Sequence, residues 1–262
     1  MISIIIVNYN SEKYLSKCIE SIINSDLNNI KIEVIIVNNN CSFGNISKID
    51  QSLNIRSIDI AKNIGYSKAI NIGIRESSYP IIITMNPDVV IKSDAIYNMY
   101  NYFNNNNNNG VLGCKVLNPD ESFQLSSRRK FPIFSVIIPY LFRFHYLGFV
   151  NNYNYMDVCT DKIHLVDSVS GACMMFSKKV YNLVEGFDER FFLYFEDTDF
   201  CTKVNIKGYN ITYYPDAEII HNKYGSRNYF NYLFVKLNFY LSFLKFIYKY
   251  KGFFFINLGI RK

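Results

Sequence analysis

Short apolar runs alternate with segments of helical spacing over the first 117 residues of the chain. The apolar runs are rich in Ile and Val and have the length of buried parallel strands. Strands are expected at residues 2–7, 33–37, 55–60, 80–85 and 111–117. Helices are expected at residues 11–24, at residues 67–76 and after residue 93, with Ser11 and Ser93 as caps. This alternation predicts an open, mostly parallel α/β sheet with helical crossover connections.

Polar clusters follow three of these strands, at residues 8–10, 38–40 and 86–88. In open α/β sheets, ligands bind beyond the carboxyl ends of the strands. Turn residues also follow strands in any fold, so each cluster is equally typical of an ordinary turn. Asp88 favours a site, because it is an isolated acid after a fully apolar strand. A carboxylate there is suited to bind Mg²⁺ or Mn²⁺ on a diphosphate, and a turn-capping Asp is the alternative.

The pattern is less regular at residues 118–165, where Phe, Tyr and Pro are frequent and Arg128, Arg129 and Lys130 form a basic cluster. An insertion or a lid is expected there. Regularity returns with an extended segment at residues 165–176, then a turn, a short helix, and two short strands at residues 211–214 and 217–221.

Three acids lie close together inside an aromatic segment, at Glu196, Asp197 and Asp199. Burying charge among aromatic rings costs free energy unless the charges are paired or face a cleft. Mutual repulsion can raise the pKa of one carboxyl toward the range of a general base, and an ordinary helix start is the alternative. His221, at the end of a later strand, could complete a metal site, although a lone His is more often structural.

Positive charge is concentrated in the C-terminal tail. The chain has 28 Lys and Arg against 22 Asp and Glu, and eight of the basic residues follow Glu218, after which no acid occurs. The rest of the chain therefore carries 6 − 8 = −2, which excludes a nucleic-acid footprint over the whole domain.

From Arg227 onward the pattern predicts a helix with one narrow polar stripe. The stripe consists of Arg227, Asn231, Asn238, Ser242, Lys245 and Lys249. A membrane-spanning helix is not expected, because no stretch of about 18 apolar residues lacks charge. The helix either lies on an anionic membrane surface or packs against the domain or a second copy in a homodimer.

The amino terminus has no charged segment followed by a cleavage site, and the six Cys residues lack metal-binding spacing. A cytoplasmic chain with reduced cysteines is therefore expected. Together with the basic tail, this predicts a peripheral location at the inner face of the cell membrane.

Seven short motifs occur in order along the chain. They are IIIVNYN at 4–10, VIIVNNN at 34–40, NIGY at 63–66, NPD at 86–88, VSGAC at 169–173, GFDERFF at 186–192 and FEDTD at 195–199. In this order they resemble the family 2 inverting glycosyltransferases with a GT-A fold. The resemblance is closest to the rhamnosyltransferase-like branch, which builds bacterial surface polysaccharides such as O-antigen or capsule.

The resemblance covers about residues 1–225 and implies a division of the chain. Residues 1–117 would form the nucleotide-sugar-binding half, and residues 118–225 the acceptor and catalytic half. Residues 226–262 would form a basic, aromatic, amphipathic C-terminal helix.

The resemblance also implies roles in catalysis. Asp197 is implied as the catalytic base, with Glu196 as the second candidate. Asp88 is implied to bind Mg²⁺ or Mn²⁺ through a DxD-like motif that has Asn86 at its other end, and His221 is implied to assist it.

Donor contacts follow from the same resemblance. The nucleotide is expected to contact Val7, Tyr9, Asn38, Asn63 and Gly65. Gly171 and Ala172 are expected near the transferred sugar, where small side chains permit close approach. Arg128 and Arg129 match a basic pair of the family and are expected to neutralise phosphate, with a solvated loop cluster as the alternative.

Two positions depart from the family pattern. The family usually has Asp where this chain has Asn38, and Ser where it has Cys41. The usual Asp accepts a hydrogen bond from the N3–H of uracil or thymine, and an Asn oxygen can accept it without charge assistance. We therefore expect weaker donor binding or a different nucleotide rather than loss of activity.

The resulting hypothesis is a metal-dependent inverting hexosyltransferase. It would move a sugar, rhamnose by family analogy, from a dTDP- or UDP-sugar to a glycan or lipid-linked glycan acceptor. The alternative is a catalytically silent homologue that serves as a glycan-binding or assembly subunit, which only Asn38 favours. A nucleotidyltransferase is disfavoured, because residues 8–11 lack the glycines and basic residues of a phosphate-binding loop.

Overall fold

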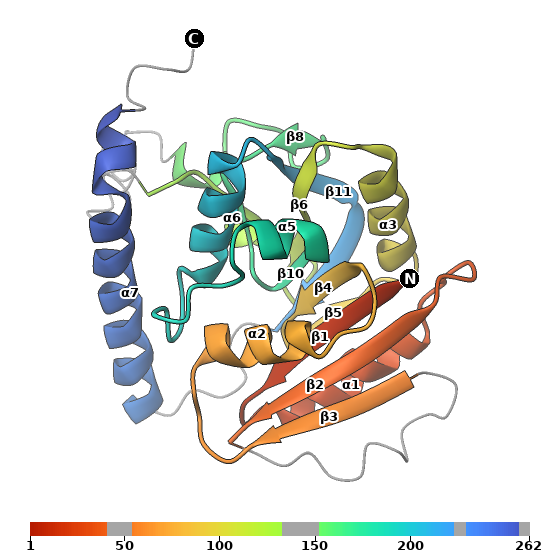
Figure 1. Ribbon diagram of the computed structural model, residues 1–262. Helices are drawn as coiled ribbons and strands as arrows, with labels where there is room; N and C mark the ends of the chain where they lie inside the picture. Colours follow the sequence, from red (N-terminus) through yellow and green to blue (C-terminus); the bar gives the residue numbers. More distant parts are fainter. Residues whose placement is uncertain (41–53, 133–151, 223–228, 257–262) are drawn as a thin grey trace.

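Within residues 1–40, 54–132, 152–222 and 229–256, which the computed structural model describes, nine strands form a central sheet with helices on both faces (Figure 1). The strand order is β3-β2-β1-β4-β10-β6-β11-β5, and β8 pairs with β11. The strands are β1 (Ile2–Asn8), β2 (Ile32–Asn39), β3 (Asn54–Ile60), β4 (Ile81–Met85), β5 (Val89–Ile91), β6 (Asn109–Leu117), β8 (His164–Leu165), β10 (Cys173–Ser177) and β11 (Asn210–His221). A separate pair joins β7 (Arg128–Arg129) to β9 (Ser168–Val169).

Six of the nine strands of the sheet, namely β1, β2, β3, β4, β6 and β11, point in the same direction. β1 pairs in parallel with β2 and β4, β2 with β3, and β6 with β11. β10 lies antiparallel between β4 and β6, and β5 is antiparallel to β11. The predicted mixed, mostly parallel sheet is therefore confirmed. Because parallel strands end at the same edge, the carboxyl ends of β1, β2, β4, β6 and β11 lie along one edge.

The alternation of side chains along β1 sets the three layers. Ile4 and Ile6 pack with helices α1 and α3 on one face, whereas Ile5 and Val7 pack with α2, α5 and α6 on the other. Burial on both faces explains why β1 and β2 are nearly continuous runs of Ile and Val. The helices are α1 (Glu12–Ile23), α2 (Tyr66–Arg75), α3 (Ala95–Asn105), α5 (Lys178–Leu183), α6 (Glu196–Ile206) and α7 (Tyr229–Ile256).

Several element boundaries differ from the prediction. The two short strands expected at 211–221 are one strand, β11, whose register against β6 shifts between Tyr214 and Glu218, around Pro215. The extended segment expected at 165–176 contains β9 and β10, because residues 170–172 leave the ladder. β5 was not expected, and the N-cap of α3 is Asp94 rather than Ser93.

The C-terminal helix α7 lies along the outside of the molecule, beside the segment that leads into α6 (Figure 1). Phe246 and Tyr250 of α7 form an aromatic cluster with Phe191 and Phe195. The helix therefore packs against the domain, which is one of the two interpretations of the tail. None of the described helices has both the length and the apolar character needed to cross a bilayer. The expected boundary at residue 225, Cys41 and Arg227 lie outside the described residues.

Candidate active site

The ends of β1 and β2 carry a chain of amide and carboxylate side chains. Asn8 and Asn38 are neighbours in register, and the Asn8 Nδ2 donates to the Asn38 Oδ1 at 3.0 Å. The Asn38 Nδ2 in turn donates to the Asp59 Oδ1 at 2.6 Å. Asn38 is fully buried, whereas Asp59 is exposed at the end of β3. The carboxylate that the family pattern places at position 38 therefore lies one strand away, at Asp59.

A second amide pair fixes the loop before α2. The Asn39 Nδ2 donates to the Asn63 Oδ1 at 3.0 Å, and its Oδ1 accepts from the backbone N–H of Ile64 at 2.9 Å. Gly65 has a φ of 85°, and a Cβ there would lie 2.7 Å from the Phe192 ring. Position 65 therefore requires glycine for two reasons: its positive φ, and the close approach of Phe192.

Val7 and Tyr9, the two residues predicted to contact the nucleobase, differ in solvent exposure. Val7 packs in the core beneath α2, with 5% of its surface exposed. Tyr9 follows the strand and is 44% exposed. Of the two, only Tyr9 presents its side chain to a ligand.

The structure brings Asp88 and His221 together, as predicted for a metal site. The His221 Nε2 lies 3.3 Å from the Asp88 Oδ1 and 3.4 Å from the Asn86 Nδ2. On the other side of the ring, the Nδ1 faces the Gln124 Oε1 at 3.0 Å, while the Gln124 Nε2 donates to Asn118. This hydrogen-bond pattern assigns the neutral ring's proton to Nδ1.

The position of this proton decides whether the Nε2 of His221 is available, together with Asp88, to a divalent cation. In the neutral ring, this tautomer turns the Nε2 lone pair toward the Asp88 Oδ1, 3.3 Å away, beside the Asn86 amide. A ring N–H bonded to an amide oxygen is the usual support of a metal-bound His, and a lone pair beside a carboxylate is a donor set that a cation would suit. Asp88 and His221 therefore fit Mn²⁺ or Mg²⁺ by donor type. No cluster of three or more His, Cys, Asp or Glu occurs in the described part of the chain.

The predicted base, Asp197, is held on both carboxylate oxygens. Its Oδ2 accepts from the Arg129 Nη2 at 2.5 Å and from the Gly171 N–H at 2.9 Å. Its Oδ1 accepts from the Thr198 N–H at 2.7 Å. Burial alone would lower the pKa of Arg129, but the adjacent Asp197 outweighs it and the pKa is raised. A Cβ at Gly171 would lie 3.2 Å from the Asp197 Oδ2, so the close approach that glycine permits here is with Asp197.

Glu196 has a different environment from its neighbour. It is 8% exposed, and burial followed by the charge of Asp197 raises its pKa to about 8. The Glu196 Oε2 and the Tyr66 Oη are buried and have no hydrogen-bond partner among the described residues. Burial, followed by the Glu196 charge, raises the pKa of the Tyr66 hydroxyl. Two unsatisfied polar atoms next to the predicted base are the kind of group that a bound hydroxyl-rich ligand would satisfy.

The base and the metal pair are linked through two consecutive residues. Gly171 donates its N–H to Asp197, and the carbonyl of Ala172 accepts from the Asn86 N–H at 2.9 Å. On the other side, the Tyr66 N–H donates to the carbonyl of Phe192. The polar clusters of both halves of the chain therefore meet at one edge of the sheet.

The prediction that Arg128 neutralises phosphate is wrong. Its guanidinium is buried and donates to the carbonyls of Cys159, Tyr155 and Val158, at 3.0, 3.1 and 2.5 Å. These donors are directed at backbone, and Arg129 is the member of the pair that faces the site. Sequence reasoning also assigned no role to Asp59, Gln124 or Tyr66, of which only Tyr66 lies in a motif, NIGY at 63–66.

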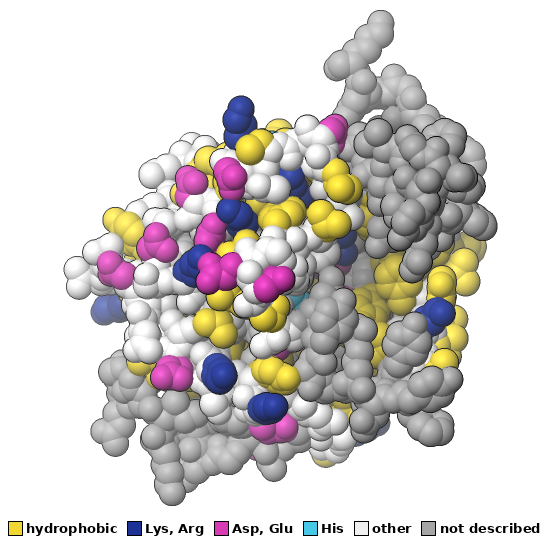
Figure 2. Space-filling view, turned by 180° about the vertical axis from the view of Figure 1, so that it is seen from behind, with side chains coloured by type: hydrophobic (Ala, Val, Ile, Leu, Met, Phe, Trp, Pro, Cys, Tyr) yellow, Lys and Arg dark blue, Asp and Glu magenta, His cyan; other side chains and the backbone are white. Residues whose placement is uncertain are grey.

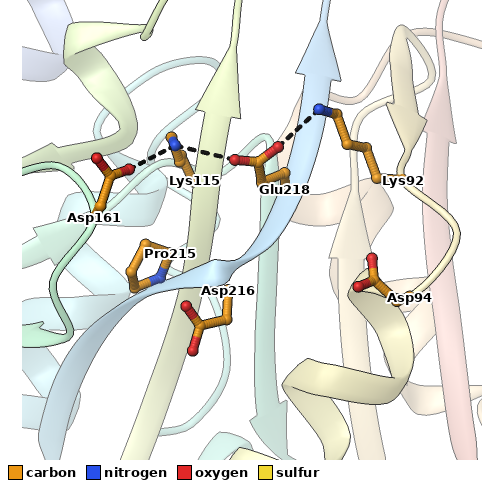
Figure 3. Close-up of a pocket in the computed structure, with 7 residues that line it drawn as sticks. All are labelled: Lys92, Asp94, Lys115, Asp161, Pro215, Asp216 and Glu218. Carbon is orange, nitrogen blue, oxygen red and sulfur yellow. Dashed lines mark hydrogen bonds and ion pairs between the residues drawn. The ribbon is translucent and has the colours of Figure 1, made fainter.

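A separate hollow is lined by none of the predicted site residues (Figure 3). Its two cations are both engaged: Lys115 pairs with Asp161 at 2.7 Å and with Glu218 at 3.0 Å, and Lys92 pairs with Glu218 at 2.8 Å. Asp94 and Asp216 add further negative charge to the lining. This hollow is therefore poorly suited to a phosphate or a diphosphate.

Known families and proteins match the sequence over most of its length. The sequence profile of Glycosyl transferase family 2 matches residues 3–183, and that of Glycosyl transferase family group 2 matches residues 132–237. Rhamnosyltransferase WbbL of Escherichia coli (strain K12) is 26% identical over 233 residues, which cover 84% of this chain and 83% of WbbL. N-acetylglucosaminyl-diphospho-decaprenol L-rhamnosyltransferase of Mycobacterium tuberculosis is 23% identical over 240 residues, which cover 85% of this chain and 76% of that protein.

Solved structures share the fold at lower identity. Mannosyltransferase PcManGT from Pyrobaculum calidifontis, in complex with GDP-Man and Mn²⁺, has a TM-score of 0.64 at 18% identity. It is matched over 88% of this chain and 59% of its own length. S. aureus TarS 1–349, in complex with UDP-GlcNAc, has a TM-score of 0.60 at 17% identity, over 86% of this chain and 59% of its own. The chain thus spans 59% of the length of these structures, and the likeness confirms the predicted GT-A fold.

Proposed function

Because this chain belongs to glycosyl transferase family 2, we propose that it is an active, metal-dependent, inverting enzyme that transfers a sugar from a nucleoside diphosphate to a hydroxyl group. One observation carries the proposal. The pair Asp88 and His221 and the carboxylate of Asp197 converge at one sheet edge, joined through Gly171 and Ala172. A donor diphosphate and an acceptor hydroxyl both need groups of these kinds, close together.

In the proposed mechanism, Asp197 takes the proton from the acceptor hydroxyl. Arg129, Gly171 and Thr198 keep its carboxylate in one orientation, so little reorganisation is needed. The acceptor oxygen attacks the anomeric carbon from the side opposite the leaving diphosphate, which inverts its configuration. Asp88 and His221 would hold Mg²⁺ or Mn²⁺, which when bound supplies positive charge against the departing diphosphate.

The hydrogen bonds that hold both carboxylate oxygens of Asp197 support it as the base. Glu196, whose pKa burial and then the charge of Asp197 raise to about 8, is the second candidate.

We infer the donor and acceptor classes from the relatives. Two of them are named as rhamnosyltransferases, and one of these names a diphospho-decaprenol-linked sugar as its acceptor. We therefore propose a rhamnosyl donor carried by dTDP or UDP, and a lipid-linked glycan acceptor at the inner face of the cell membrane. The product would be a bacterial surface polysaccharide.

A catalytically silent, glycan-binding homologue is the second candidate, and Asn38 is the feature that favoured it. The hydrogen bond from Asn38 to Asp59 weakens that argument, because a carboxylate still lies at this end of the site. Asp88, Asp197 and His221 are all present as well.

Donor binding and transfer by paired variants test the proposal. The panel contains dTDP-rhamnose, UDP-GlcNAc, UDP-glucose, UDP-galactose and GDP-mannose, each titrated with and without Mn²⁺. Asp88→Ala is expected to lose Mn²⁺-dependent donor binding. Asp197→Asn is expected to keep donor binding and to lose transfer by about 10²–10⁴-fold.

Asp120→Asn, in an exposed turn, is the matched control and is expected to behave as wild type. If the folded wild-type protein bound none of the donors, the silent homologue would replace the enzyme as the better account.

A further inference from the structure

The two sides of α7 differ in exposure. One side contacts the domain through Ser242, Phe246 and Tyr250, each less than a tenth exposed. At 100° per residue, the opposite side carries apolar side chains that are each at least 45% exposed. They are Leu233, Leu237, Tyr240, Leu241, Leu244 and Tyr248, with Phe234 at the margin, and together they form the outer face of α7.

The inner side uses the polar stripe of the sequence. The Ser242 Oγ donates to the carbonyl of Leu193 at 2.8 Å, and the Lys249 Nζ donates to Asp188 at 2.7 Å and Asp199 at 2.6 Å. The Tyr250 Oη donates to the Asp199 Oδ1 at 2.8 Å. Because these polar groups are turned toward the domain, the apolar side chains are left facing outward.

Of the exposed large apolar side chains among the described residues, α7 carries the longest contiguous set. Seen from behind, hydrophobic side chains are visible along the margin where α7 lies, whereas in the opposite half Lys, Arg, Asp and Glu are interspersed with hydrophobic side chains (Figure 2). Contiguous exposed apolar surface of this kind marks an interaction site rather than ordinary protein surface.

Charge distinguishes between a lipid surface and a second copy as its occupant. Lys236 and Lys245 border the outer face on its two sides, and Lys251 lies in line with it. All three are exposed, and the Lys245 Nζ donates to the carbonyl of Arg190 at 2.9 Å. No acid occurs after Glu218. A second copy of the same face would bring like charges together, whereas anionic headgroups would pair with them. Tyr240 and Tyr248 add rings of the amphipathic type that is enriched at the membrane interface.

We propose that the outer face of α7 docks on an anionic lipid surface while the inner face of the same helix holds the segment that carries Glu196 and Asp197. Asp199, which Lys249 and Tyr250 bind, lies two residues after Asp197 in the first turn of α6. The helix thus connects the lipid surface to the base through one rigid element. Docking does not depend on the transfer reaction; its use in reaching a lipid-linked acceptor rests on the proposed function.

Vesicle co-sedimentation of the full chain tests the proposal. Wild type is expected to partition onto vesicles of phosphatidylcholine mixed with phosphatidylglycerol, less onto phosphatidylcholine alone, and less at high salt. Leu237→Ser combined with Leu244→Ser is expected to reduce partitioning by at least about tenfold. Leu125→Ser combined with Leu165→Ser, two exposed leucines elsewhere, is the matched control and is expected to leave it unchanged.

Equal partitioning of the two double variants would overturn the proposal. So would a wild-type dimer that fails to bind vesicles and that Leu237→Ser with Leu244→Ser dissociates, because a second copy would then be the occupant. The vesicles contain no acceptor glycan, so a failed donor screen and failed docking are separate results. Donor affinity is expected to be the same in both double variants, which tests that the outer face acts apart from the site.

Discussion

Asp197 and Asp88 lie at the same edge of the sheet, and the protein treats them differently. Both oxygens of Asp197 accept hydrogen bonds from N–H groups of the chain, including a guanidinium. The Asp88 Oδ1 instead faces a ring nitrogen of His221 across 3.3 Å. Asp88 is also the more accessible, with 22% of its side chain exposed against 11% for Asp197.

This difference shows which of the two carboxylates has a cationic partner within the chain itself. The positive partner of Asp197 is built into the chain, so its position is fixed before any substrate binds. The partner that Asp88 and His221 would take comes from outside with the donor. Under the proposed mechanism, the carboxylate of Asp197 is preorganised, whereas the side that carries Asp88 and His221 would be completed on binding.

The largest expected effect comes from removing the built-in countercharge. Arg129→Met leaves the buried carboxylate of Asp197 without its cation and free to rotate, so we expect the rate of transfer to fall by about 10²-fold. Donor affinity should be unchanged, because Arg129 lies on the base side. Steady-state transfer kinetics and donor calorimetry measure the two quantities.

Lys130→Met, at the next position, is the control and should leave the rate of transfer as it is. A normal rate in Arg129→Met would show that the base needs no fixed partner.

A second variant tests the donor side through the support of His221. Gln124→Leu removes the acceptor that holds the ring tautomer, and we expect Mn²⁺ affinity to fall by about 10–100-fold. Gln124→Glu keeps an acceptor at this place and should retain most of the affinity. Titration of the protein with Mn²⁺ alone, followed by electron paramagnetic resonance, gives the affinities. Identical affinities in the two variants would contradict the assigned tautomer.

The nucleotide end of the site is tested by restoring the residue typical of the family. Asn38→Asp would set a second carboxylate against Asp59, in place of a 2.6 Å hydrogen bond, and we expect donor affinity to fall by about tenfold. Adding Asp59→Asn should recover it. Calorimetry on the two single variants and the double variant completes the cycle. An improvement from Asn38→Asp alone would mean that Asp59 does not take over the carboxylate's role.

A last variant concerns stability and the raised pKa of Glu196. Burial, followed by the charge of Asp197, raises the pKa of this carboxyl from 4.5 to about 8 on folding. The contribution of Glu196 to stability is therefore fully present below pH 4.5 and is lost as pH rises through 8. Glu196→Gln should flatten this dependence and raise the Tm at pH 9 by about 2–4 °C for each kcal/mol recovered.

Thermal unfolding from pH 5 to pH 9 measures it, with Glu20→Gln on the exposed side of α1 as control. Parallel curves for Glu196→Gln and wild type would refute the raised pKa.

Much of the fold could be predicted from the sequence, and so could the proximity of Asp88 to His221. Strands such as β1 and β2 are continuous apolar runs, and parallel strands must carry their polar ends to one edge. The directions in which individual side chains point could not be predicted. Arg128 and Arg129 are adjacent on β7 and so point to opposite sides, and the sequence does not say which side faces the site. Gln124 and Asp59 were missed because their roles exist only through contacts with His221 and Asn38, which are 97 and 21 positions away.

Because the chain is synthesised from its amino terminus, the contacts that α7 makes with Asp199 form after the segment that they hold. Tyr194 and Phe195 both have a φ near 65°, a backbone conformation that costs such residues about 1–3 kcal/mol each. The side chains that fasten this segment through Asp199 are made 50 and 51 residues later. At about 5–20 residues per second, a ribosome needs on the order of 3–10 s to cover that distance. A nascent chain therefore has its sheet and its carboxylates before it has the helix that holds Asp199.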